Sequence, residues 1–118
     1  MVKTIVFLKR KHGMSDAQFR DYCEAHGRLV QKYIGHLFLD FKRNYVIRQR
    51  RYSRSTLEDV PPAWNSIVEM YFADAASREQ AFSILASPEV DPVIEADEKR
   101  FLDCSNITAL ECDEMVTS

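Results

Sequence analysis

Glycine, cysteine and long apolar runs are all scarce in this sequence of 118 residues. Its three glycines, Gly13, Gly27 and Gly35, are too few and too far apart to form a glycine-rich phosphate-binding loop. The three cysteines are widely spaced and include no Cys-x-x-Cys pair, so the sequence indicates neither a disulfide framework nor a zinc site. No apolar run approaches the roughly 20 residues that a membrane-spanning helix needs. We therefore expect a protein without membrane attachment.

A strong excess of charge of either sign is also missing. The formal net charge of -2 at pH 7 gives no general attraction to nucleic acid, and we expect no nucleic-acid partner. Residues 48–54 hold four arginines, which we interpret as a solvated loop, with a cationic lid for an anionic substrate as the alternative. The first ten residues become charged again too soon for a secretory signal, so we expect a cytoplasmic protein.

The sequence does contain a clear amphipathic helix signal from Ser15 to Tyr33. Ser15 and Gln18 have the spacing of a capping box, in which each residue satisfies a free backbone N–H of the other. Downstream, apolar and aromatic residues recur at steps of three and four, which places them on one side of a helix. These residues are Phe19, Tyr22, Cys23, His26, Leu29, Val30 and Tyr33. The stripe therefore contains a single imidazole, and Gly35 follows as a helix stop.

The remaining pattern predicts an α+β chain. Strands are expected over residues 3–11, 36–49, 65–73 and 103–112, a loop over 50–62, and short helices from Ser77 to Ser87 and from 88 to 99. This order matches the ferredoxin-like βαββαβ unit, which we assign to a single domain over 1–113, followed by a free tail over 114–118. Because helices cover only one sheet face in that fold, we expect a homodimer that covers the other.

Several segments, taken in order, resemble the EthD-domain family. They are residues 6–11, 13–15, 19–22, 26–30 (His-Gly-Arg-Leu-Val), 69–72, 86–89 and 97–103. The resemblance implies a dimeric α/β barrel with a pocket in each subunit between the helices and the concave sheet face. It also implies a place in catabolic oxidation or aromatic polyketide pathways and, for some members, decarboxylase, dehydratase or cyclase activity without a cofactor. A proline common after the family's His-Gly pair is replaced here by Arg28, either a local change of turn or a cation at the pocket mouth.

His26 is the leading candidate for general acid–base catalysis, because an imidazole exchanges protons near neutral pH. Spacing alone favours a buried structural histidine, whereas the family motif favours function. In the functional interpretation, Tyr22 or Arg28 steadies a developing oxyanion. Cys23 is a weaker candidate for a nucleophile, since its proximity to His26 is the only feature that supports this role.

Further side chains are candidates for binding a substrate. They are Tyr33, His36, Asp40, Tyr45, Trp64, Tyr71 and Phe101, the last within the 97–103 segment. Core packing is the alternative for the aromatic ones. Asp40 either orients His26 or acts as a base with a raised pKa. The alternative is that it faces solvent at a strand edge or pairs with Lys42 or Arg43. Asp103 lies at an element boundary and is interpreted as a cap or turn residue.

The histidines lack the spacing of metal ligands, and we expect no metal and no other cofactor. The sequence thus predicts a cofactor-independent lyase or isomerase that moves a proton on a small aromatic, polyketide-like or cyclic substrate. The alternative is a non-catalytic dimer that sequesters a hydrophobic intermediate or supports a partner oxygenase. A third interpretation is a sheet face that serves only as a dimer interface.

Overall fold

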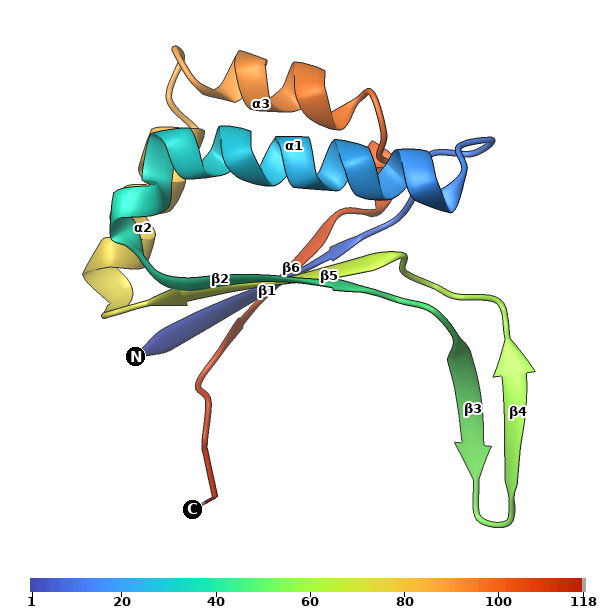
Figure 1. Cartoon of the computed structure of the whole chain (residues 1–118). Coiled ribbons are helices and arrows are strands. Elements are labelled where there is room, and N and C mark those ends of the chain that lie inside the picture. The colour runs from blue at the N-terminus through green and yellow to red at the C-terminus, as the bar shows by residue number, and fades with distance from the viewer. Residues whose placement is uncertain (118) are drawn as a thin grey trace.

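A computed structural model describes residues 1–117 of the chain (Figure 1). Its strands are β1 (Val2–Leu8), β2 (Phe38–Tyr45), β3 (Gln49–Ser53), β4 (Thr56–Val60), β5 (Ser66–Phe72) and β6 (Thr108–Cys112). Its helices are α1 (Asp16–Ile34), α2 (Ala75–Leu85) and α3 (Asp91–Glu98), with 3-10 turns at Gly35–Leu37 and Cys104–Asn106. No helix within residues 1–117 is long and apolar enough to cross a membrane.

The main sheet has the strand order β2-β5-β1-β6, and all neighbouring strands are antiparallel. Figure 1 shows the three helices on one side of this sheet. The register places Val6 of β1 beside Val68 of β5 and Ala109 of β6. This arrangement confirms the expected ferredoxin-like α+β fold.

The predicted capping box of α1 is present. Ser15 Oγ accepts a hydrogen bond from the Gln18 backbone N–H at 3.2 Å, and Gln18 Oε1 accepts one from the Ser15 N–H at the same distance. From this start, the apolar stripe turns towards the sheet and buries Phe19, Cys23 and Ile34. The cap and the amphipathic packing therefore both support α1.

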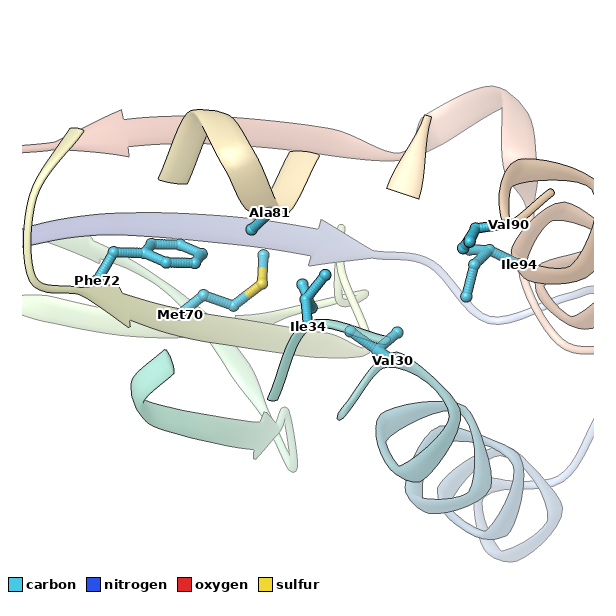
Figure 2. Packing of buried hydrophobic residues seen from close by; sticks show 7 residues of the cluster. All are labelled: Val30, Ile34, Met70, Phe72, Ala81, Val90 and Ile94. Atoms are coloured by element: carbon cyan, nitrogen blue, oxygen red, sulfur yellow. The ribbon is translucent and has the colours of Figure 1, made fainter. Parts of the chain in front are cut away.

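The helices and the sheet enclose a core with two buried clusters. Figure 2 shows one of them, in which residues of α1, β5, α2 and the α3 region meet: Val30, Ile34, Met70, Phe72, Ala81, Val90 and Ile94. The second cluster contains Leu8, Phe19, Cys23, Phe101 and Leu102. Since alternate residues of a strand face opposite sides, the even-numbered residues of β5 point to the helices.

The expected loop over 50–62 is wrong, because residues 49–60 form the β3–β4 hairpin, which extends away from the main sheet (Figure 1). Its sequence has no apolar alternation. Besides the backbone hydrogen bonds, exposed ion pairs join its two strands: Arg50 lies 3.2 Å from Asp59, and Arg51 lies 3.7 Å from Glu58.

Several expected boundaries also change, two of them because of a capping aspartate. Helix α2 begins earlier than Ser77, because Asp74 Oδ1 accepts a hydrogen bond from the Ser77 N–H at 2.8 Å and caps the helix. Strand β6 begins only at Thr108, because Asp103 caps the turn before it by accepting from the Ser105 N–H. The interpretation of Asp103 as a cap is therefore confirmed.

The expected free tail is attached at its first residue. Glu114 Oε2 accepts hydrogen bonds from Lys3 Nζ at 2.8 Å and from the Tyr71 hydroxyl at 3.2 Å. These bonds hold the chain against the sheet face that the helices leave open. Ser118, the last residue of the expected tail, lies outside the described residues.

Candidate functional site

A cavity of about 230 Å³ lies between the helices and the sheet. Its lining comes from all three helices and all four strands of the main sheet, and most of the lining side chains are apolar. The exceptions are His26, Arg43, Ser66, Glu98 and the thiol of Cys23. An apolar hollow with a few polar groups is the usual form of a small-molecule site.

His26 is held at the cavity wall by a carboxylate. Its Nδ1 lies 2.7 Å from Asp97 Oδ2, and the side chains of both residues are largely buried. The ring also packs against Phe101, with 5.3 Å between ring centroids. Because an ionised carboxylate only accepts hydrogen bonds, Nδ1 of the neutral imidazole carries the proton and Nε2 has the lone pair. This is the arrangement of an oriented general base.

Glu98 follows Asp97 and also lines the cavity. Its Oε2 lies 3.9 Å from His26 Nε2. Burial raises the pKa of the Glu98 carboxyl, and the positive charge that His26 carries when it is protonated opposes that rise only in part. Glu98 is therefore more readily protonated than an exposed glutamate, and in that form it donates a hydrogen bond.

Arg43 reaches the cavity from β2, but its charge is balanced. Arg43 Nε and Nη2 each donate to Glu24 of α1 at 2.8 Å, a bidentate pair, and the Tyr45 hydroxyl donates to the same carboxylate. The Arg43 and Tyr45 hydrogen bonds lower the pKa of Glu24 to about 2. Burial, and then the bond to Glu24, raise the pKa of Tyr45.

Gly27 lies where α1 approaches the side chains of β2. A Cβ atom built on Gly27 would lie 3.4 Å from both Arg43 Cδ and Phe41 Cε1. A methyl group at this position would thus be in contact with two residues that line the cavity.

Cys23 does not have the properties of a nucleophile. Burial raises the pKa of its thiol to about 12, with the charge of Glu24 adding to the rise. The reactive form of cysteine is the thiolate, which is scarce at neutral pH under these conditions. The structure therefore favours a structural role for Cys23.

The structure brings together two of the side chains predicted for the site, His26 and Phe101, at the cavity wall. The three other candidates on α1 lie outside the lining. Tyr22 is partly exposed and stacks on Phe101 at 5.8 Å, and Arg28 is exposed. Tyr33 packs against the core cluster.

Candidates in and around β2 also lie outside the cavity lining. His36 and Asp40 are exposed, and Asp40 accepts a hydrogen bond from the Phe41 N–H and lies 3.7 Å from Lys42. The role of orienting His26, suggested for Asp40, belongs to Asp97. Tyr45 contacts Glu24 rather than the cavity.

Trp64 and Tyr71 lie on the opposite side of the sheet. Trp64 packs on Phe7 with 5.5 Å between centroids, and Phe7 alternates with two residues that face the cavity. The ammonium groups of Lys3 and Lys42 lie 5.1 and 5.2 Å from the centroid of the Tyr71 ring. Pocket roles for these two aromatic residues are not supported.

Sequence reasoning missed Asp97, Glu98, Arg43 and Ser66 as parts of the site. A usable signal existed for the first two, because the adjacent carboxylates lie in the 97–103 segment that carries the EthD resemblance. Arg43 and Ser66 carry no such signal, since their strand positions become meaningful only when the sheet faces are known.

Comparison with known proteins gives matches to solved structures but none to curated proteins. The chain is similar to an EthD family protein of Bacillus halodurans, with 20% identity, a TM-score of 0.62, and coverage of 98% of this chain and 100% of that one. It is also similar to SnoaB, a cofactor-independent oxygenase of Streptomyces nogalater, with 11% identity, a TM-score of 0.58, and coverage of 98% and 94%. A dimeric protein of unknown function with a ferredoxin-like fold, from Bacteroides fragilis, matches at 9% identity and a TM-score of 0.57, with coverage of 96% and 95%.

These structural matches agree with the fold described above. A match of the sequence to a family model is more specific, because it indicates the family. The model of the EthD domain matches residues 11–105, which include α1, the whole of β5 and the Asp97–Glu98 pair. Most of the chain is thus covered by one family model. The chain belongs to the EthD domain family.

Proposed function

We propose that this protein is an enzyme that moves a proton on a small aromatic or cyclic substrate, without a cofactor. The observation that carries the proposal is the hydrogen bond of 2.7 Å between His26 Nδ1 and Asp97, made at the wall of an apolar cavity. A carboxylate so placed stabilises the imidazolium that forms when Nε2 takes up a proton. General base catalysis of this kind contributes about 10²–10⁴-fold to a rate.

In this proposal, His26 Nε2 removes a proton from a carbon next to a carbonyl group of the substrate. Negative charge then develops on the carbonyl oxygen. Glu98 in its protonated form donates a hydrogen bond to that oxygen, a role for which Tyr22 and Arg28 are poorly placed because they lie outside the lining. Decarboxylation, dehydration and cyclisation can all use such a proton transfer, so the proposed class is a lyase or isomerase.

One of the structurally similar proteins supports the part of the proposal that no cofactor is needed. SnoaB is described as a cofactor-independent oxygenase, and it shares the fold of this chain. An enolate stabilised in an apolar cavity is a reactive carbanion equivalent that needs no prosthetic group to form. The mostly apolar lining supports a substrate with apolar rings.

Exchange of hydrogen for deuterium tests the proton transfer directly. The bicyclic ketone 2-tetralone, dissolved in D₂O, has exchangeable hydrogens next to its carbonyl group that proton NMR can follow. We expect the protein to accelerate their exchange above the buffer rate and His26→Gln to remove the acceleration. Binding of 2-tetralone without accelerated exchange would contradict the enzyme and favour the non-catalytic binding protein.

We also propose that the protein is a homodimer formed through the open sheet face. That face carries the Phe7–Trp64 pair and Leu110, which is 47% exposed. The relative from Bacteroides fragilis is described as dimeric. Analytical ultracentrifugation should show twice the chain mass, and Leu110→Lys should shift the protein towards monomer, whereas a monomeric wild type would refute the dimer.

A further inference from the structure

Ser66 has an unsatisfied hydroxyl group at the wall of the cavity. It is the first residue of β5, its side chain is 0% exposed, and it lies on the face of the strand that points to the helices. Among residues 1–117, its Oγ has no hydrogen-bond partner. A buried hydroxyl without a partner is costly and uncommon in native structures.

The side chains around Ser66 leave no obvious partner within the chain. In the sheet, Ser66 lies between the apolar Leu8 of β1 and Tyr45 of β2. The Tyr45 hydroxyl is already bonded to Glu24. The Ser66 hydroxyl thus stays without a partner among these neighbours, on a residue that lines the cavity.

The size of the cavity limits what that ligand is. An apolar cavity of about 150 Å³ is enough to hold benzene. The cavity here, at about 230 Å³, has room for a fused pair of rings. Its mostly apolar lining leaves few positions at which a polar atom of such a ligand is satisfied, and Ser66 is one of them.

We infer that Ser66 is a specificity-determining residue whose hydroxyl binds the phenol or ketone oxygen of a fused-ring aromatic ligand. The inference rests on the proposed function only in that the cavity binds an aromatic ligand. It adds that the site distinguishes an oxygen-bearing ring from an apolar ring of the same shape. It also assigns recognition of the ligand oxygen to Ser66 on β5 rather than to His26.

Thr4 provides a matched control within the same sheet. It is 1% exposed, and its Oγ1 also has no partner among the residues that the structure describes, but it does not line the cavity. Removal of either hydroxyl should have a similar effect on folding, because both are buried and unsatisfied. Only Ser66 should affect ligand choice.

The experiment measures the dissociation constants of 2-naphthol and 2-methylnaphthalene, which have nearly the same shape, by fluorescence titration at pH 7. A hydrogen bond of ordinary strength predicts that the wild type prefers 2-naphthol by about three- to tenfold. Ser66→Ala should lose this preference while retaining its affinity for 2-methylnaphthalene. Thr4→Val should keep the preference of the wild type.

Three results would overturn the inference. Equal binding of both probes by the wild type, or a preference that persists in Ser66→Ala, would remove the role of Ser66 while leaving an aromatic ligand in the cavity. Failure of the folded wild type to bind either probe would overturn both this inference and the proposed ligand class. Circular dichroism of each variant separates these results from loss of folding.

Discussion

His26 Nδ1 and Asp97 Oδ2 lie 2.7 Å apart although 71 positions separate the two residues in the chain. The contact joins the middle of α1 to the last turn of α3. Its consequence is chemical, because the carboxylate determines which ring nitrogen carries the proton. The free lone pair is then on Nε2, the nitrogen that lies 3.9 Å from Glu98.

Replacing Asp97 by asparagine should reverse this tautomer. The amide of Asp97→Asn can donate to Nδ1, which moves the proton to Nε2, so accelerated exchange of 2-tetralone should fall by about 10²–10⁴-fold. Nitrogen-15 NMR of the histidine rings should show the change of tautomer directly. Glu95→Gln, an exposed change on the same helix, should alter neither measurement. An unchanged tautomer in Asp97→Asn would contradict the assigned role.

Glu24 should make the protein sensitive to acid. Its pKa is lowered from 4.5 to about 2 by Arg43 and Tyr45, so the folded state releases this proton more readily than the unfolded state. The resulting stability is present above pH 4.5 and is lost as the pH falls towards 2. Urea unfolding should therefore show Glu24→Gln as destabilising at pH 6, with a smaller effect at pH 3. Glu79→Gln, exposed on α2, is the control, and an effect of Glu24→Gln that does not shrink in acid would refute the linkage.

Cys23 should resist thiol reagents in the folded protein. Its thiol, with a pKa of about 12, is buried and almost fully protonated at pH 8, whereas Cys104 is exposed. Ellman's reagent should label no more than two thiols before unfolding and three afterwards. In Cys23→Ala, the folded count should stay the same and the unfolded count should fall by one. Rapid labelling of three thiols in the folded wild type would contradict this.

Phe101 should be a main source of stability beside the site. It is 0% exposed and packs on Phe19 and His26, with centroid distances of 6.0 and 5.3 Å. Truncation of such a ring removes about 3–5 kcal/mol from the free energy of unfolding. Urea unfolding of Phe101→Ala measures this loss. The hairpin residue Tyr52, 75% exposed, gives the control variant Tyr52→Ala, which should change stability by less than about 0.5 kcal/mol.

The β3–β4 hairpin should be dispensable for folding. Its cross-strand ion pairs are largely exposed and are worth at most about 1 kcal/mol each. The chain ends that flank it stay together, because the Val46 N–H donates to the Asn65 carbonyl at 3.0 Å. Replacement of residues 49–60 by a short Gly-Ser linker should therefore preserve a cooperative thermal transition in circular dichroism. Loss of that transition would show that the hairpin stabilises the main sheet.

Most of the fold could be predicted from local patterns in the sequence. The Ser15 cap and the apolar stripe of α1 depend on residues within one or two helical turns of each other. The interacting residues can therefore be recognised from their spacing in the sequence. The hairpin was missed for a related reason. Its strands carry charged residues on both faces and no glycine or asparagine at the turn, and the signal that usually marks a hairpin is therefore missing.

By itself, the sequence determined the family, the order of the helices and of the main-sheet strands, and the placement of His26 on the buried side of α1. Only the tertiary structure decided what His26 touches. Asp97 and Glu98 reach it because α3 packs near α1, a relationship between distant segments that no local spacing encodes. The same holds for Trp64 and Tyr71, whose aromatic character suggested a pocket. Tyr71 alternates along β5 with residues that face the helices, and Trp64 packs on Phe7, so both lie on the face that the helices leave open.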